Sequence, residues 1–151
     1  MKPSEIQAAA VDALEAAAWF TAAPAVPIIS ADGTEDDAVE NALNGVGFAV
    51  IVSPVMAGKP ISGGNGVGLV VVRSEFWVRV ACNPKANTAD TTGADRDTVE
   101  AVEKVVSTLN ALPYAAGETR IELDGEGFEM VANDIGLLAY DIKFSKRCTI
   151  P

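Results

Sequence analysis

The sequence contains no histidine. Histidine is the side chain that proteins use most often as a general base near neutral pH, and it is also the commonest metal ligand. A Ser–His–Asp or Cys–His catalytic arrangement therefore cannot exist in these 151 residues. The S-x-x-K spacing of enzymes that pair serine with lysine is absent as well. We therefore predict that the protein is not an enzyme.

Cysteine is almost as scarce. Only Cys82 and Cys148 occur, they stand far apart, and no C-x-x-C motif exists. The sequence therefore contains no recognisable zinc or redox motif. We expect both residues to be free, buried thiols in a reducing compartment.

The glycine-rich stretches lack the spacing of a nucleotide site. A dinucleotide fingerprint reads G-x-G-x-x-G, but Leu69 stands where the third glycine would follow Gly64 and Gly66. The acidic segment 32–37 likewise lacks the residue order of a calcium loop, because Asp37 stands where that loop needs glycine. We therefore predict that the protein needs no cofactor and no metal.

Basic residues are few, with 11 Lys and Arg against 21 Asp and Glu, for a net charge of −10. A chain of this sign repels phosphate, which argues against sequence-specific binding of nucleic acid and against an anionic membrane surface. No apolar run approaches the length of a transmembrane helix. The N-terminal segment also carries acidic residues where a signal peptide needs an uncharged core. We expect a soluble, acidic protein made inside the cell.

Three segments have the spacing of amphipathic helices, namely 4–20, 35–44 and 98–112. In the first, Ser4 and Gln7 fit a capping box, and small apolar residues recur at helical spacing. The second begins with acidic residues, which the helix dipole favours at an N-terminus. The third has the strongest apolar stripe of the chain.

The clearest strand is 69–82, in which an apolar row alternates with a mixed row over about fourteen residues, far more than a usual strand. A continuous apolar run at 46–55 predicts a second, central strand. The segments 119–123 and 128–132 flank the turn sequence DGEG and predict a hairpin. The segment 135–147 alternates like a closing strand.

Consecutive strands are therefore joined as hairpins, the longest over 46–82, with polar loops at 57–68 and 83–96. This order predicts an α+β fold, a mostly antiparallel sheet of about four to six strands with helices packed on it. The chain length fits a single domain over 1–151.

The mixed row of the long strand carries Arg73, Glu75, Trp77 and Arg79. A large aromatic beside arginine is typical of protein–protein contacts, so we predict that these four residues contact another subunit or partner. The alternative is that a helix of the same chain covers this row.

This arrangement resembles the tail terminator, or tail completion, proteins of long-tailed bacteriophages, the lambda-type minor tail protein U group. The resemblance spans an N-terminal amphipathic helix (4–20), an extended Pro-containing segment (24–30), a long hairpin (46–82), one helix (98–112) and closing strands (119–147). The acidic helix at 35–44 and the DGEG turn depart from that pattern.

The resemblance implies a structural virion protein that acts without a cofactor. Such proteins assemble in the host cytoplasm into a ring, usually a hexamer, on the head-proximal end of the tail tube. They end polymerisation of the tail tube protein and join the tail to the head connector, and DNA passes through the ring. Two alternatives remain, another head–tail joining or tail-tube-like assembly protein, and a small-ligand-binding or enzymatic α+β domain.

Overall fold

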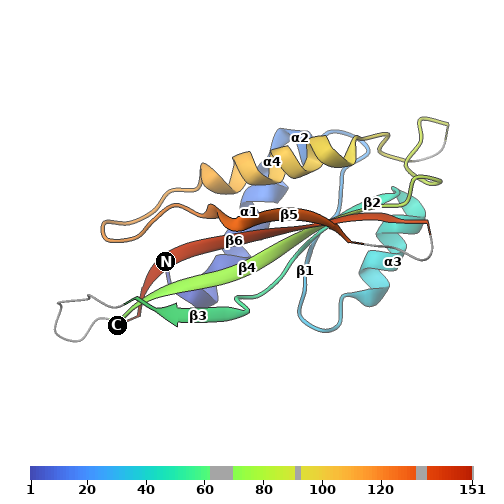
Figure 1. Ribbon diagram of the computed structural model, residues 1–151. Coiled ribbons are helices and arrows are strands. Elements are labelled where there is room, and N and C mark those ends of the chain that lie inside the picture. The colour runs from blue at the N-terminus through green and yellow to red at the C-terminus, as the bar shows by residue number, and fades with distance from the viewer. Residues whose placement is uncertain (62–69, 91–92, 132–135, 151) are drawn as a thin grey trace.

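The structure, a computed structural model, describes residues 1–61, 70–90, 93–131 and 136–150. A six-stranded sheet forms its centre (Figure 1). The strand order is β1-β2-β4-β6-β5, and β3 pairs with the remaining length of β4. Only β1 and β2 are parallel, so the predicted α+β class with a mostly antiparallel sheet is confirmed. The strands are β1 (Ile28–Ser30), β2 (Phe48–Val52), β3 (Ala57–Pro60), β4 (Val70–Cys82), β5 (Glu122–Val131) and β6 (Leu138–Ile150).

The two longest strands form one continuous ribbon. β4 and β6 pair without interruption from Val70 opposite Ile150 to Cys82 opposite Leu138. Every second residue of β4 from Val72 onward is buried, as the period of the sequence predicts. The long strand expected over 69–82 is therefore confirmed, and β6 begins and ends three residues later than the strand expected over 135–147.

One face of the sheet is covered by three helices, α1 (Ile6–Ala16), α2 (Ala18–Thr21) and α4 (Thr98–Asn110). Their apolar stripes bury a single core that includes Leu14, Leu109, Phe48 and Phe144. Phe144 stacks on Phe76 with ring centroids 5.4 Å apart. The side chain of Asp97 accepts a hydrogen bond from the amide of Glu100 and so caps α4.

The first helix differs from the expected continuous span of 4–20. It is broken at Ala17, whose ψ of 126° is extended, and a short 3-10 helix, η1 (Pro3–Glu5), precedes it. Ser4 and Gln7 do not form the predicted capping box. The Gln7 amide instead donates to the carbonyls of Ala31 (3.0 Å) and Val52 (2.8 Å), which ties α1 to the sheet. A tertiary hydrogen bond has replaced the local one.

Of the described helices, α3 (Asp36–Gly45) alone lies on the opposite face, close to the helix predicted at 35–44. Ala42 and Leu43 pack there against a small second cluster that includes Ile51, Ala81 and Ala139. Gly47 follows α3 with a positive φ of 77°, and a Cβ there would lie 2.3 Å from the amide nitrogen of Asn87. Only glycine allows this close approach.

The hairpin predicted around DGEG is wrong. Residues 122–123 and 128–131 of the two flanking segments belong to one strand, β5, and both parts pair with β6. Residues 124–127 lie opposite the single residue Lys143, which makes a wide bulge, and Gly127 supplies a positive φ of 66° there. Pairing with the long β6 edge therefore outweighs the local turn signal. Residues 57–60 of the predicted loop 57–68 form β3, and residues 62–69 lie outside the described residues.

Both cysteines are buried and free, as expected, and burial raises the pKa of each thiol.

A buried ion pair lies on the face of the sheet that α1, α2 and α4 cover. Lys146 is 2% exposed, and its ammonium lies 3.1 Å from Glu118 and donates to the carbonyl of Thr119 (2.7 Å). The Met1 amine also pairs with Glu118.

Candidate functional site

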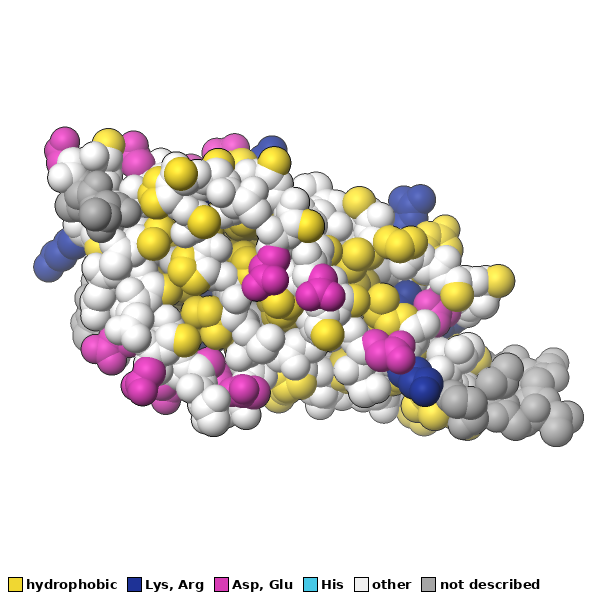
Figure 2. Space-filling model, turned by 180° about the vertical axis from the view of Figure 1, so that it is seen from behind, with side chains coloured by type: hydrophobic (Ala, Val, Ile, Leu, Met, Phe, Trp, Pro, Cys, Tyr) yellow, Lys and Arg dark blue, Asp and Glu magenta, His cyan; other side chains and the backbone are white. Residues whose placement is uncertain are grey.

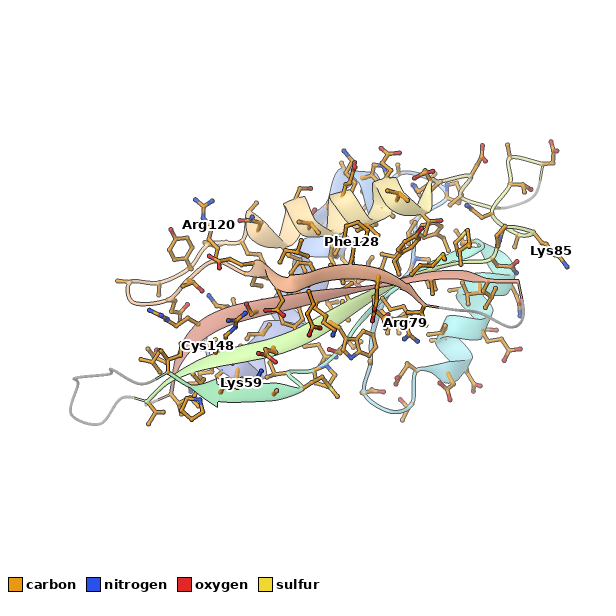
Figure 3. All side chains as sticks on the ribbon, in the orientation of Figure 1. Lys59, Arg79, Lys85, Arg120, Phe128 and Cys148 are labelled. Atoms are coloured by element: carbon orange, nitrogen blue, oxygen red, sulfur yellow. The ribbon has the colours of Figure 1, made fainter. Side chains whose placement is uncertain are left out.

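The four residues predicted to make a contact lie on one face of β4. Arg73, Glu75, Trp77 and Arg79 alternate with buried residues and point away from α1, α2 and α4. α3 covers the β2 side of this face and contacts the sheet around Ala81, so much of the row beyond it is open to solvent. We call the face of the sheet that carries these four residues the open face. Figure 3 shows Arg79 on β4 and Lys59 on β3, which also pairs with β4. The expectation that the four residues share a face is met, and their contact role stays a prediction.

Most charges of the row are used within the chain. The Arg79 guanidinium binds both carboxylate oxygens of Asp141, at 2.7 and 2.8 Å, and lies 5.4 Å from the centre of the Trp77 ring. Hydrogen bonding to Asp141 raises the pKa of Arg79. Arg73 pairs with Asp124 in the β5 bulge, and Glu75 pairs with Lys59 at 2.8 Å. These pairs hold the strands in register and leave the Trp77 ring as the apolar part of the row.

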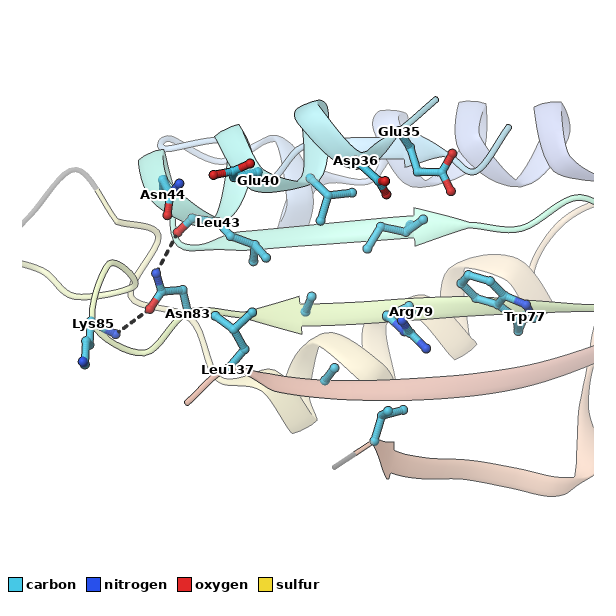
Figure 4. A pocket seen from close by; sticks show the side chains of 15 residues that line it. Glu35, Asp36, Glu40, Leu43, Asn44, Trp77, Arg79, Asn83, Lys85 and Leu137 are labelled. Atoms are coloured by element: carbon cyan, nitrogen blue, oxygen red, sulfur yellow. Dashed lines mark hydrogen bonds between the residues drawn. The ribbon is translucent and has the colours of Figure 1, made fainter. Parts of the chain in front are cut away.

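A groove of about 680 Å³ runs between α3 and this row. Its floor is formed by Ile51, Trp77, Arg79 and Ala81, and its far wall by Leu137 and neighbouring residues of β5 and β6. Figure 4 shows Glu35, Asp36 and Glu40 along α3 above the floor strands. One end is closed by Asn83, whose amide donates to the carbonyl of Leu43 (3.2 Å). The groove thus has one acidic wall and a floor that is apolar except for Arg79, which is paired with Asp141.

Glu35, at the start of this wall, is held in its charged form. The Glu35 carboxylate accepts hydrogen bonds from the amides of Gly33 (2.6 Å) and Asp32 (3.0 Å). Its pKa is lowered by its own backbone amide and then by that of Gly33. No ion pair between described residues involves Glu35, Asp36 or Glu40, and the one unpaired cation among the residues that line the groove is Lys85.

Sequence reasoning missed the α3 wall and the β5 side of this site. A signal for the wall was present, because no lysine or arginine occurs between residues 3 and 58, although eight acidic residues do. The contribution of Leu137 and Val131 had no local signal, since it depends on β5 and β6 lying beside β4.

A second exposed apolar region lies along the edge strand. β5 pairs only with β6 among the described strands, and Phe128 and Met130 are 47% and 62% exposed. On the rear face shown in Figure 2, hydrophobic side chains gather in the middle, and Asp and Glu outnumber Lys and Arg. An edge strand with exposed large hydrophobics is open to pairing with another chain.

A metal-binding cluster and a membrane-spanning helix are both absent from the described part of the chain. Within residues 1–61, 70–90, 93–131 and 136–150 no group of histidine, cysteine and carboxylate side chains is placed to hold a metal ion. None of the helices described there is long and apolar enough to span a membrane.

Comparison with known proteins gives a structural match. No protein-family model matches the chain, and no curated protein matches its sequence. Among solved structures, a chain described as "Virion of native gene transfer agent (GTA) particle" matches with a TM-score of 0.58 and 18% sequence identity. The match covers 93% of this chain and 92% of that chain. At this identity the finding is a shared fold over nearly the whole length of both chains.

Proposed function

We propose that this chain is a structural virion protein that forms a ring at the head-proximal end of a phage-type tail. In this role it ends polymerisation of the tail tube and joins the tail to the head connector. The observation that carries the proposal is the fold shared along 93% of the chain with a chain of a gene transfer agent virion. The order of helix, extended segment, long hairpin, helix and closing strands, which resembles tail terminator proteins, supports the more specific role.

The surfaces of the molecule are suited to assembly. Proteins that work as single copies rarely leave a large groove with a partly exposed tryptophan in its floor and an exposed hydrophobic edge strand uncovered. Here the groove over Trp77 and the β5 edge with Phe128 and Met130 lie on different parts of one sheet. Exposed surfaces of this kind are suited to contacts with neighbouring copies or with other virion proteins.

The charge of the chain fits the same role. With a net charge of −10, the protein repels a polyanion at long range. A ring of such subunits gives DNA a passage without sequence-specific contacts. The proposed partners are further copies of the chain, the tail tube protein and the connector protein, in a virion assembled in the host cytoplasm.

The first test is the state of assembly of the purified protein. Sedimentation velocity over a range of concentrations and negative-stain electron microscopy are expected to give a closed ring with a central hole. Open tubes that lengthen with concentration would instead favour a tail-tube-like protein. A compact monomer under all conditions would contradict the ring and favour the ligand-binding alternative, for which the groove would be the site.

The second test addresses termination. Purified tail tube protein from the same genome is allowed to polymerise with and without this chain, and tube lengths are measured by electron microscopy. A terminator is expected to shorten the tubes in proportion to the amount added and to sit at one end only. Tubes of unchanged length with no end-bound density would refute the terminator role.

A further inference from the structure

The open face carries an unusual transverse row of like charges. Lys59, Arg73 and Arg147 lie directly opposite one another on three adjacent strands, β3, β4 and β6. Like charges placed opposite each other across strands destabilise a sheet. Their side chains remain accessible, with Lys59 68% and Arg73 47% exposed, and Arg147 is exposed too. We call these three residues the cation row.

Ion pairs within the chain neutralise only part of the positive charge of the cation row. Lys59 pairs with Glu75, and Arg73 pairs with Asp124 and approaches Glu75 at 3.9 Å. Arg147 has no ion pair among the described residues; its contact there is a backbone amide donated to the Thr119 hydroxyl (3.0 Å). One guanidinium therefore stays available for an external anion. Val70 and Ile150, at the end of the same strands, are also exposed, but strand alternation points their side chains to the other face of the sheet.

The opposite end of the same face has the complementary character. Asp36 and Glu40 of α3 are exposed, and they have no ion pair among the described residues. They flank the groove whose apolar floor contains Ile51 and Trp77. In Figure 1 the Val70–Ile150 end of the β4–β6 ribbon and α3 lie at opposite ends of the molecule. Cations at one end of the open face thus match carboxylates at the other end.

We propose that the cation row of one copy docks against α3 and the groove of the next copy, a head-to-tail contact. The inference rests on the proposed ring and names the surfaces that close it. Contacts between two different surfaces of identical subunits generate rings when the rotation closes. A second copy is a better occupant than DNA, because the net charge of −10 opposes a polyanion, whereas α3 supplies carboxylates of the required sign.

The experiment reverses one charge on each surface. Glu40→Lys and Arg147→Glu alter exposed residues that have no ion pair among the described residues, so both variants are expected to keep the wild-type circular dichroism spectrum. Each is expected to raise the protein concentration needed for half-assembly at least tenfold in sedimentation velocity. The double variant Glu40→Lys/Arg147→Glu restores the opposite signs and is expected to assemble within about threefold of wild type.

Glu103→Lys is the matched control. It makes the same change of charge at an exposed position of α4, on the other side of the sheet, and is expected to assemble as wild type does. Loss of assembly in Glu103→Lys equal to that in Glu40→Lys would mean that net charge alone is responsible, and would overturn the inference.

The remaining outcomes separate the inference from the proposed function. Rings that form equally well with both single reversals would overturn the head-to-tail contact and leave the ring itself standing. Single reversals that weaken assembly without rescue in the double variant would also overturn the pairing. If Arg147→Glu instead abolishes binding of a short DNA duplex and leaves assembly intact, the cation row serves nucleic acid. A wild-type protein that never assembles would refute the proposed function, and the inference with it.

Discussion

The two faces of the sheet are built in different ways from the same strands. On the helix-covered face, Val78, Ile142 and Phe144 are at most 1% exposed and pack against α1 and α4. On the open face, the charged residues of β4 and β6 are half-buried or exposed, and ion pairs with neighbouring strands join most of them, while Ala81 and Ala139 pack in the small cluster with α3. Stability is therefore concentrated on one face, and the other face is free to take on contacts.

The difference between the two faces accounts for the regular alternation of buried and accessible residues along β4. Period-2 alternation places every second side chain of β4 in the core and presents the others as a single row. Ion pairs between exposed side chains contribute little to stability in water. Substitutions on the two faces of the same strand pair are therefore expected to differ in effect, and the following predictions test that difference.

The largest effect is expected from the helix-covered face. Phe144→Ala removes a fully buried ring and its stack on Phe76, and this change is expected to lower the free energy of unfolding by about 3–5 kcal/mol. Urea denaturation followed by circular dichroism measures it. A loss below about 1 kcal/mol would mean that this face is not the packed core.

The buried ion pair on the same face is expected to come next. Lys146→Met leaves Glu118 buried without its lysine partner, and loss of one member of such a pair costs about 3 kcal/mol or more. The same urea titration measures it. The double variant Lys146→Met/Glu118→Gln removes both charges and is expected to recover part of the loss; no recovery would contradict a role for the charge on Glu118.

The acid limb of the stability curve is expected to report on the same pair. Burial by itself raises the pKa of Glu118, but hydrogen bonds from the N-terminal amine and from Lys146 outweigh it and set the pKa below 4.5. The stabilisation is therefore present above pH 4.5 and is lost as the pH falls through the lowered value. Thermal unfolding between pH 7 and pH 3 is expected to show a steeper loss for wild type than for Glu118→Gln. Parallel curves would exclude Glu118 as the cause.

A smaller effect on stability is expected at the centre of the open face. Trp77→Ala removes a half-buried ring and the contact with Arg79, at a cost of about 1 kcal/mol, and leaves the chain folded. Self-association in sedimentation velocity is expected to weaken more clearly than folding does. Should Trp77→Ala unfold the chain, the residue belongs to the core and its contact role has to be abandoned.

The smallest effect on stability is expected from a change at Lys143, the residue next to Phe144 on β6. Lys143→Ala removes an exposed lysine that pairs with Glu126 in the β5 bulge, and we expect no measurable change in the urea midpoint. This variant is the neighbour control for Phe144→Ala, because adjacent residues of β6 point to opposite faces. A loss of stability comparable to that of Phe144→Ala would remove the contrast between the faces.

Much of the fold was predictable from residues close together in the sequence. The alternation over β4, the apolar run of β2 and the stripe of α4 each depend on side chains a few positions apart, and all three elements were found. The row of Arg73, Glu75, Trp77 and Arg79 could be assigned to one face for the same reason. The N-cap at Asp97 is equally local, because its partner is three residues away.

What the sequence could not decide is which distant segments lie side by side. The DGEG segment has a turn signal, yet it forms a bulge because β6 offers a pairing edge on both sides of it. The sequence by itself determined α3, α4, the long strand and the residues on each face of β4, since these follow from local periodicity. The cation row, the groove beneath α3 and the buried Lys146–Glu118 pair exist only in the tertiary structure, because strand order and register bring together residues that are far apart along the chain.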